Sequence, residues 1–239
     1  MTLNKIQHPN LKDEYISYGF FTRNYGFSKH PFNSLNCSFN VDDEENDVKR
    51  NLALVCQELR LKKLVKLNQI HSSEVIIIDN YDKQNSKLIG DGLVTNLKSI
   101  GLSILGADCA PILFYDNKSK TIGACHAGWR GAVDNIVENT IIKMENIGAN
   151  RQNIIAIIGP TIQKKSYEIK EDVAKRVKDT FYFKKNHSIL FHIKNDRYLF
   201  DLPLLLKTSL ESCGINKIND VNINTYEKNN LFFSQIFVS

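Results

Sequence analysis

Short apolar runs, separated by polar turns, dominate the middle of the chain. Such runs are typical of buried or half-buried strands. The pattern predicts clustered strands at Leu64–Ile70, Val75–Asp79, Leu93–Asn96, Gly101–Leu105, Ile112–Asp116 and Thr121–His126. It predicts one earlier strand at Gly19–Arg23, and later strands at Ile154–Ile158, Val221–Asn224 and Leu231–Val238. The central strands therefore follow one another instead of alternating with helices.

Apolar residues at helical spacing mark the other elements. Helices are expected at Asp47–Arg60, from Val133 to Met144, at Glu171–Asp179 and at Leu202–Ser212. Asp201 is a plausible N-cap for the last of these, and Pro203 falls in its first turn. The polar stretch Asn24–Asn46 has no such period and is expected to be a long loop.

Clustered strands favour a mixed-sheet α+β fold over a doubly wound parallel sheet. The chain has no repeat, no Pro/Gly/Ser-rich linker and no low-complexity tract, so we expect a single domain over residues 1–239. With 42% hydrophobic and 24% charged residues, its composition is that of an ordinary globular protein.

Charge and cysteine usage exclude several classes of function. The net charge of +5 is scattered and forms no basic stripe with aromatic residues, so no nucleic-acid partner is expected. No apolar stretch approaches the roughly 20 residues of a membrane span, and residues 1–10 contain no signal-peptide core. The five cysteines are odd in number and include no CxxC pair, which favours a reducing compartment. We therefore expect a cytoplasmic protein with no membrane partner.

Three residues beside apolar segments carry the candidate chemistry. His126 ends an apolar run and meets the small residues of a Gly-rich turn, while His71 and Cys109 follow two other apolar segments. Two imidazoles and one thiolate form an incomplete tetrahedral shell, the pattern of a catalytic zinc with one open position. Copper would also bind such a set.

Simpler interpretations compete with a metal site. A histidine at a strand end is more often structural, a free cysteine is often merely buried, and the three residues are far apart in sequence. Cys125 neighbours His126 on a strand, so its side chain should point to the opposite face, into the core. Asp116 and the histidines at positions 8, 30, 187 and 192 stand in polar contexts and are expected at the surface or in loops.

Five motifs resemble those of the YfiH/laccase-domain family. They are Asn68-Gln69-Ile70-His71, Asp91-Gly92-Leu93-Val94-Thr95, Ala107-Asp108-Cys109-Ala110-Pro111, His126-Ala127-Gly128-Trp129-Arg130-Gly131 and Gly159-Pro160. The resemblance runs in order from Phe20 to Ser234. Members were first called polyphenol oxidases or multicopper laccases, and were later recognised as purine nucleoside phosphorylases with adenosine deaminase activity. The resemblance implies zinc bound by His71, Cys109 and His126, in a layered α/β/β/α arrangement of mixed sheets.

The chain departs from the family pattern in three places. Many members carry Cys or His before Tyr-Glu, where this chain has Lys164-Lys165-Ser166-Tyr167-Glu168. Many carry Cys-Thr where this chain has Asn224-Thr225. The usual Phe-Phe-Ser-Tyr-Arg-Arg ending is replaced by a run from Phe232 to Phe237 that contains no basic residue. If the basic segment binds substrate or phosphate, we expect reduced or altered activity.

The resemblance predicts a zinc-dependent phosphorylase acting on nucleosides of the adenosine, inosine and methylthioadenosine class, with possible adenosine deaminase activity. His71, Cys109, His126 and Asp108 are the predicted catalytic residues; Asp108 could orient a ligand or shuttle a proton. Arg130 and Arg23 are candidates for binding the phosphate, although either could be a structural arginine. Purine nucleosides and phosphate are the expected partners, and the oligomeric state is left open.

Three other functions stay open. A copper-dependent polyphenol oxidase is one, although six histidines without a His-x-His pair are few for a self-contained laccase. A cysteine hydrolase with Cys109 as nucleophile and a histidine base is another. The third is a catalytically weak metal-binding or partner-binding protein. The H-x-E and P-C-x-x-C signature of zinc deaminases is absent, so any deaminase activity would rest on a different kind of site. The P-loop and the Rossmann glycine motif are also absent, so no nucleotide cofactor is expected.

Overall fold

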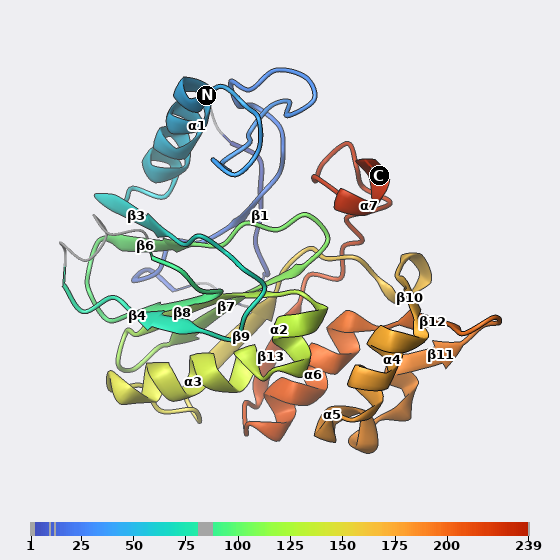
Figure 1. The fold of residues 1–239 in the computed structure, drawn as a ribbon. Helices are drawn as coiled ribbons and strands as arrows, with labels where there is room; N and C mark the ends of the chain where they lie inside the picture. The colour runs from blue at the N-terminus through green and yellow to red at the C-terminus, as the bar shows by residue number, and fades with distance from the viewer. Residues whose placement is uncertain (1–2, 10, 12, 81–87, 239) are drawn as a thin grey trace.

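A six-stranded mixed sheet forms the centre of the molecule (Figure 1). The computed structural model describes residues 3–9, 11, 13–80 and 88–238. Across the sheet the strand order is β13-β9-β7-β8-β5-β4. Their bounds are β4 Val75–Ile77, β5 Gly92–Thr95, β7 Ala110–Asp116, β8 Ile122–Ala127, β9 Ile154–Ile158 and β13 Lys217–Asp220. The outer pairs β4–β5 and β13–β9 are parallel, and the inner strands pair antiparallel.

Layers cover both faces of this sheet. On one side α3 (Ile136–Asn146) and α6 (Leu202–Ser212) pack against it (Figure 1). On the other side lies a parallel pair, β3 (Lys63–Lys66) and β6 (Ile100–Ser103), which is covered in turn by α1 (Glu45–Glu58). The expected α+β fold with mixed sheets is thus confirmed, and its layers follow an α/β/β/α order.

Smaller elements complete the chain. They are β1 (Lys5–Ile6) paired with β2 (Phe20–Phe21), the short helices α2 (Trp129–Val133), α4 (Glu171–Lys178), α5 (Phe181–Lys185) and α7 (Gln235–Val238), the 3-10 turns η2 (Lys164–Ser166) and η3 (His187–Ile189), and a three-stranded sheet of β10 (Glu168–Lys170), β12 (Arg197–Phe200) and β11 (Leu190–His192). None of the helices among the described residues has the length and apolar character needed to cross a membrane.

Side chains on the central strands alternate between the two flanking layers. Val94 and Cys125 pack in the cluster on the helix side, while Leu93 packs with Val65 and Ile100 on the side of β3 and β6. Each fully buried aliphatic side chain contributes about 1.5–3 kcal/mol. The parity argument for Cys125 is confirmed, because this thiol is buried in the core on the face opposite His126.

Three expectations about the elements are wrong. The single helix expected from Val133 to Met144 is split into α2 and α3, because Asn135 has a left-handed backbone with φ 67°. The strand expected at Val221–Asn224 lies earlier, at β13; this edge strand carries polar residues, which weakened its apolar pattern. The strand expected at Leu231–Val238 is replaced by turns and α7, with Ser234 and Ile236 bound to a side chain instead of a neighbouring strand.

The polar sequence around Asp116 predicted a position at the surface or in a loop, but this residue is buried. Only 1% of its surface is exposed at the end of β7. Its carboxylate accepts hydrogen bonds from the backbone N–H groups of Lys118 and Ser119 in the β7–β8 turn, and from that of Asn150. Asp116 therefore organises the turn, and the polar residues around it are its hydrogen-bond partners.

Candidate metal centre

Strand pairing brings two members of the His-Cys-His set together. Because β7 and β8 are antiparallel, the start of β7 lies opposite the end of β8, with Ala110 paired to Ala127 and Pro111 to His126. Cys109 immediately precedes β7 and therefore lies beside His126. His71 reaches the same place from the turn after β3, where it adopts a left-handed backbone with φ 58°.

The three candidate ligand atoms of His71, Cys109 and His126 lie within 4.8 Å of one another. The two imidazole rings meet edge to face, with centroids 4.9 Å apart. His126 is only 4% exposed, whereas His71 is exposed and Cys109 is intermediate. The cluster is therefore buried at its base and open to solvent on the side of His71.

Gly128 makes room for this cluster. A Cβ atom at this position would lie 2.9 Å from the Cys109 sulfur and 3.2 Å from Cδ2 of His71. The first separation is shorter than real Cβ contacts and the second is tighter than most, so a side chain at residue 128 would push the thiol away and crowd the imidazole. The small residues after His126 thus have a local steric reason.

Asp91 organises the cluster from below. Its carboxylate accepts hydrogen bonds from the backbone N–H groups of Ile70, His71 and Ser72, and from the Ser72 hydroxyl. Its Oδ1 also lies 2.8 Å from Nδ1 of His126. Burial opposes ionisation, but the bonds from His126 and Ser72 outweigh it and hold the pKa of Asp91 well below its usual range. A single carboxylate thereby fixes both the His71 turn and the His126 ring.

The Asp91 contact leaves Nε2 of His126 as the nitrogen available to the cluster. Burial alone would lower the pKa of His126, but hydrogen bonds to Asp91 and Cys109 raise it to about 9. Burial would raise the pKa of the Cys109 thiol, yet hydrogen bonds to His126 and His71 bring it down to about 7. The surroundings of Cys109 thus favour the thiolate, the form that binds metals and attacks electrophiles.

The donor set fits a borderline-soft metal ion. Zinc bonds of about 2.0–2.3 Å in a tetrahedral site place neighbouring donor atoms about 3.5 Å apart. The three donor atoms lie within 4.8 Å of one another, so side-chain movements on the order of 1 Å would bring them to these separations. Three protein donors leave a fourth position open, and the exposure of His71 gives that position access to solvent.

Asp108 lies next to Cys109, but its carboxylate points elsewhere. It is 5% exposed and accepts hydrogen bonds from the Thr225 hydroxyl, the Ser234 hydroxyl and the backbone N–H of Ile236. The predicted catalytic role of Asp108 stays a prediction.

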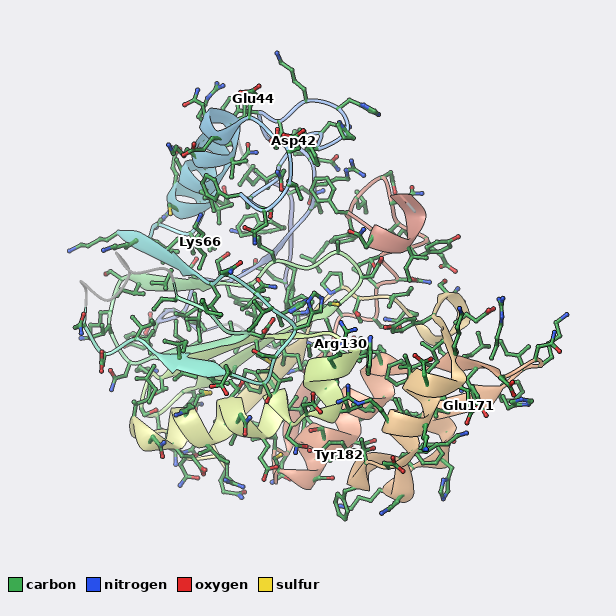
Figure 2. All side chains as sticks on the ribbon, in the orientation of Figure 1. Asp42, Glu44, Lys66, Arg130, Glu171 and Tyr182 are labelled. Carbon is green, nitrogen blue, oxygen red and sulfur yellow. The ribbon has the colours of Figure 1, made fainter. Side chains whose placement is uncertain are left out.

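The two candidate arginines differ in their surroundings. Arg130 is exposed at the start of α2 (Figure 2) and stacks on Trp129, with no hydrogen bond or ion pair to any described residue. Arg23 donates to the backbone carbonyls of Asn33, Pro31 and Asn229. The guanidinium of Arg130 is thus available to an anion, whereas that of Arg23 is engaged with the protein.

Sequence reasoning missed two groups at this site. Asp91 belongs to a motif that resembles the family, but nothing local shows that it contacts His126, which is remote in sequence. Tyr167 is the other group. Burial is the main cause that raises the pKa of its phenol, and the negative charges of Cys109 and Asp108 raise it further. The one sequence signal that could have pointed to Asp91 is its position directly before the apolar run of a buried strand. The structure shows that this carboxylate is 0% exposed.

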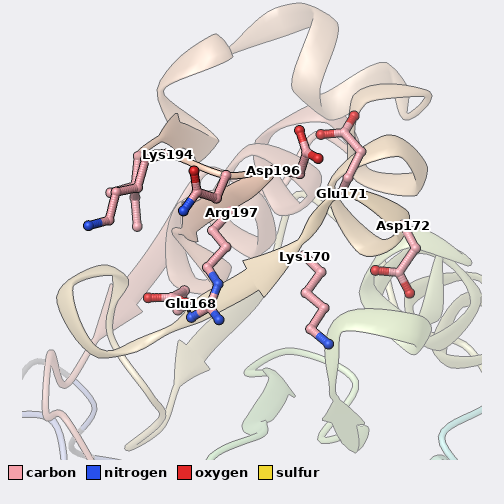
Figure 3. Close-up of a pocket in the computed structure, with 9 residues that line it drawn as sticks. Glu168, Lys170, Glu171, Asp172, Lys194, Asp196 and Arg197 are labelled. Carbon is pink, nitrogen blue, oxygen red and sulfur yellow. Dashed lines mark hydrogen bonds and ion pairs between the residues drawn. The ribbon is translucent and has the colours of Figure 1, made fainter.

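Two surface hollows among the described residues lie away from this cluster. One of about 640 Å³ is lined by the β10 and β12 segments, with Glu168, Lys170, Glu171 and Arg197 around it (Figure 3). Its charges are mixed, and Arg197 pairs with Glu168. None of the three cluster residues lines it, so this hollow is not part of the candidate centre.

The fold and the site together define the class: an α+β protein with mixed sheets that carries a solvent-open His-Cys-His group able to hold a metal ion. The chain belongs to the family described as multi-copper polyphenol oxidoreductase laccase, whose model matches residues 17–236. This confirms the resemblance noted from the sequence motifs.

Relatives and solved structures agree with this assignment. A purine nucleoside phosphorylase of Rickettsia prowazekii is 31% identical over 214 residues, covering 88% of this chain and 84% of the relative. One from Haemophilus influenzae is 31% identical and covers 89% and 85%. The crystal structure of a Neisseria meningitidis protein of family DUF152 superposes with a TM-score of 0.88 at 26% identity, covering 99% and 94%. That of Bacillus licheniformis YfiH gives 0.83 at 27% identity, covering 92% and 86%.

Proposed function

We propose that this protein is a metal-dependent purine nucleoside phosphorylase, with zinc held by His71, Cys109 and His126. The observation that carries the proposal is the convergence of these donors at one solvent-open site. Support comes from the relatives, which are named purine nucleoside phosphorylases. The substrates are then a purine nucleoside and inorganic phosphate.

In phosphorolysis a phosphate oxygen bonds to C1′ of the ribose while the bond from C1′ to the base nitrogen breaks. Arg130 is the candidate for binding the phosphate, since its donors have no hydrogen-bond or ion-pair partner among the described residues. Asp91 holds His126 in the required orientation through Nδ1. A bound zinc ion would supply Lewis-acid stabilisation of developing negative charge at the open position.

The test is turnover of a nucleoside by purified, zinc-loaded protein. Adenosine and phosphate are incubated with wild-type protein, Cys109→Ala and the control Cys125→Ala, whose thiol is buried in the core. We expect adenine and ribose 1-phosphate from the wild type and from Cys125→Ala, and none from Cys109→Ala. No turnover of adenosine, inosine or methylthioadenosine by folded, metal-replete protein would contradict the proposal.

Adenosine deaminase activity is a finer prediction that the same chromatogram tests. Deamination releases inosine with or without phosphate, whereas phosphorolysis requires phosphate. Inosine formed in phosphate-free buffer by the wild type, and lost in Cys109→Ala, would support a second activity at this site.

A copper-dependent phenol oxidase is the second candidate, favoured by the family description. Within the described part of the chain, His71, Cys109 and His126 form the group that could hold a metal ion, and three donors suit a single ion. Copper-loaded protein is therefore assayed for oxygen uptake with a phenol. Oxidation at a rate well above that of copper-loaded Cys109→Ala would favour the oxidase.

A cysteine hydrolase is the third candidate, favoured by the Cys109 thiol pKa of about 7 beside two imidazoles. Chelation separates it from the proposal. A hydrolase that uses the free thiolate keeps its activity on an ester after exhaustive chelation, whereas the proposed phosphorylase loses its activity and regains it when zinc is returned.

A further inference from the structure

The C-terminal segment, residues 225–236, is fastened at two points to the Asp108 carboxylate. Near its start, the Thr225 hydroxyl donates to Oδ1 over 2.7 Å. Near its end, the Ser234 hydroxyl and the Ile236 backbone N–H donate to Oδ2 over 2.9 and 3.1 Å. One buried carboxylate therefore closes the segment into a loop.

Asp108 is itself held rigidly. Its backbone is left-handed, with φ 81°, and its carbonyl oxygen accepts from the Thr161 hydroxyl at 2.6 Å and from the Ile162 N–H at 3.0 Å. Cys109 is the next residue along the chain. Any rotation of the Asp108 backbone that released the C-terminal segment would also shift the Cys109 thiol.

A second anchor, Arg23, holds the middle of the segment. The backbone N–H of Arg23 donates to the Leu231 carbonyl over 2.7 Å, and its guanidinium donates to the Asn229 carbonyl and lies 4.3 Å from the centre of the Phe233 ring. Both anchors use a charged group, but of the two it is Asp108 that directly precedes a residue of the cluster, Cys109. Asp108 is therefore the direct link between the segment and the cluster.

We propose that Asp108 is a positioning residue, which fastens the C-terminal segment to the loop of Cys109 and so fixes the thiol relative to the two imidazoles. The inference rests on the proposed metal site and deepens it. It gives the C-terminal segment a function, that of setting the metal affinity of a centre to which it contributes no ligand.

The test compares Asp108→Asn and Thr225→Val with Thr208→Val. The first replaces the carboxylate by a neutral amide with one acceptor oxygen, and the second removes one hydroxyl donor. The control removes a buried hydroxyl that bonds only within α6, to the Leu204 carbonyl. Co²⁺ affinity and the thiolate-to-cobalt absorption band report the position of the thiol. Trypsin cleavage after the exposed Lys228 reports release of the segment.

We expect Asp108→Asn to bind Co²⁺ about tenfold more weakly, with a shifted absorption band, and to be cleaved about tenfold faster. Thr225→Val should show the same changes to a smaller extent, and Thr208→Val neither. Faster cleavage with an unchanged affinity and band would overturn the inference, as would unchanged cleavage.

If the wild type bound no Co²⁺, the proposed function would fail separately. The rate of Cys109 alkylation by iodoacetamide in metal-free protein would then decide the positioning role. A rate in Asp108→Asn equal to that in Thr208→Val would overturn the inference, and a clearly different rate would support it.

Discussion

Asp91 shows how much of the candidate centre depends on one side chain that offers no ligand. Its carboxylate accepts from three successive backbone N–H groups and one hydroxyl, and also contacts His126. Partners of this kind fix the ring orientation of a metal-binding histidine. We expect Asp91→Asn to weaken zinc binding by about 10–100-fold, measured by competition with a chromophoric chelator.

Asp116→Asn is the matched control for this variant. Asp116 is also a buried carboxylate that accepts several backbone N–H groups, but it lies at the opposite end of β7 from Cys109. Its loss should leave zinc affinity unchanged. Equal weakening in both variants would show that Asp91 acts through general stability and not through His126.

Arg130 provides the second prediction at this scale. Replacing it by Met removes the charge while keeping most of the length of the side chain. A hydrogen bond to a charged group contributes about 1.5–3 kcal/mol, so KM for phosphate should rise about tenfold to a hundredfold. KM for the nucleoside and the zinc content should change little. Steady-state kinetics with varied phosphate measure the effect.

Arg176 offers the control for Arg130. The two guanidiniums lie at similar distances from the Trp129 ring, 5.0 and 5.1 Å, but Arg176 is paired with Asp134. Arg176→Met should therefore leave KM for phosphate within about twofold of the wild type, the range expected of a surface change. A rise as large as that in Arg130→Met would mean that stacking on Trp129 matters and not the free charge.

At the level of elements, the β7–β8 turn carries a prediction about pH. Burial of Asp116 raises its pKa, but the bonds from the N–H groups of Asn150, Lys118 and Ser119 outweigh burial and hold the pKa below its ordinary value of 3.8. A carboxyl whose pKa is lowered by folding stabilises the fold fully at a pH above its ordinary pKa. This stabilisation is lost as the pH falls through the pKa that the carboxyl has in the folded state.

Asp116→Asn should therefore cost about 1.5–3 kcal/mol in the free energy of unfolding at pH 7. Urea unfolding at a series of pH values measures the difference between wild type and variant. We expect the difference to be constant above about pH 5 and to shrink below pH 3.8, where the wild-type carboxyl becomes protonated. A difference that grew as the pH fell would contradict this account.

Elements with strong periodic patterns could be predicted from the sequence, and those held by tertiary contacts could not. The central strands β7, β8 and β9 lie where their apolar runs placed them, because both faces of each are covered. Residues 231–238 carry a similar apolar run, yet Ser234 and Ile236 bond to Asp108. No local pattern encodes a partner that is so remote in sequence.

For the molecule as a whole, the ligands of the candidate centre come from three separate places. His71 follows β3, Cys109 precedes β7, and His126 lies near the end of β8. The identities of these residues were predictable from the family motifs, but their convergence depends on the pairing of β7 with β8 and on the Asp91 contacts. An ion bound by all three would therefore bind the folded chain and not the unfolded one.

Zinc should accordingly raise the melting temperature. An ion present at about 100 times its dissociation constant adds about 2.7 kcal/mol to stability, which corresponds to about 5–10 °C for a chain of this size. Thermal unfolding is followed with and without zinc for wild type, Cys109→Ala and Cys125→Ala. The last should melt lower because a buried core thiol is lost, yet keep the full shift with zinc. Cys109→Ala should lose the shift. An undiminished shift in Cys109→Ala would place the stabilising zinc elsewhere in the protein.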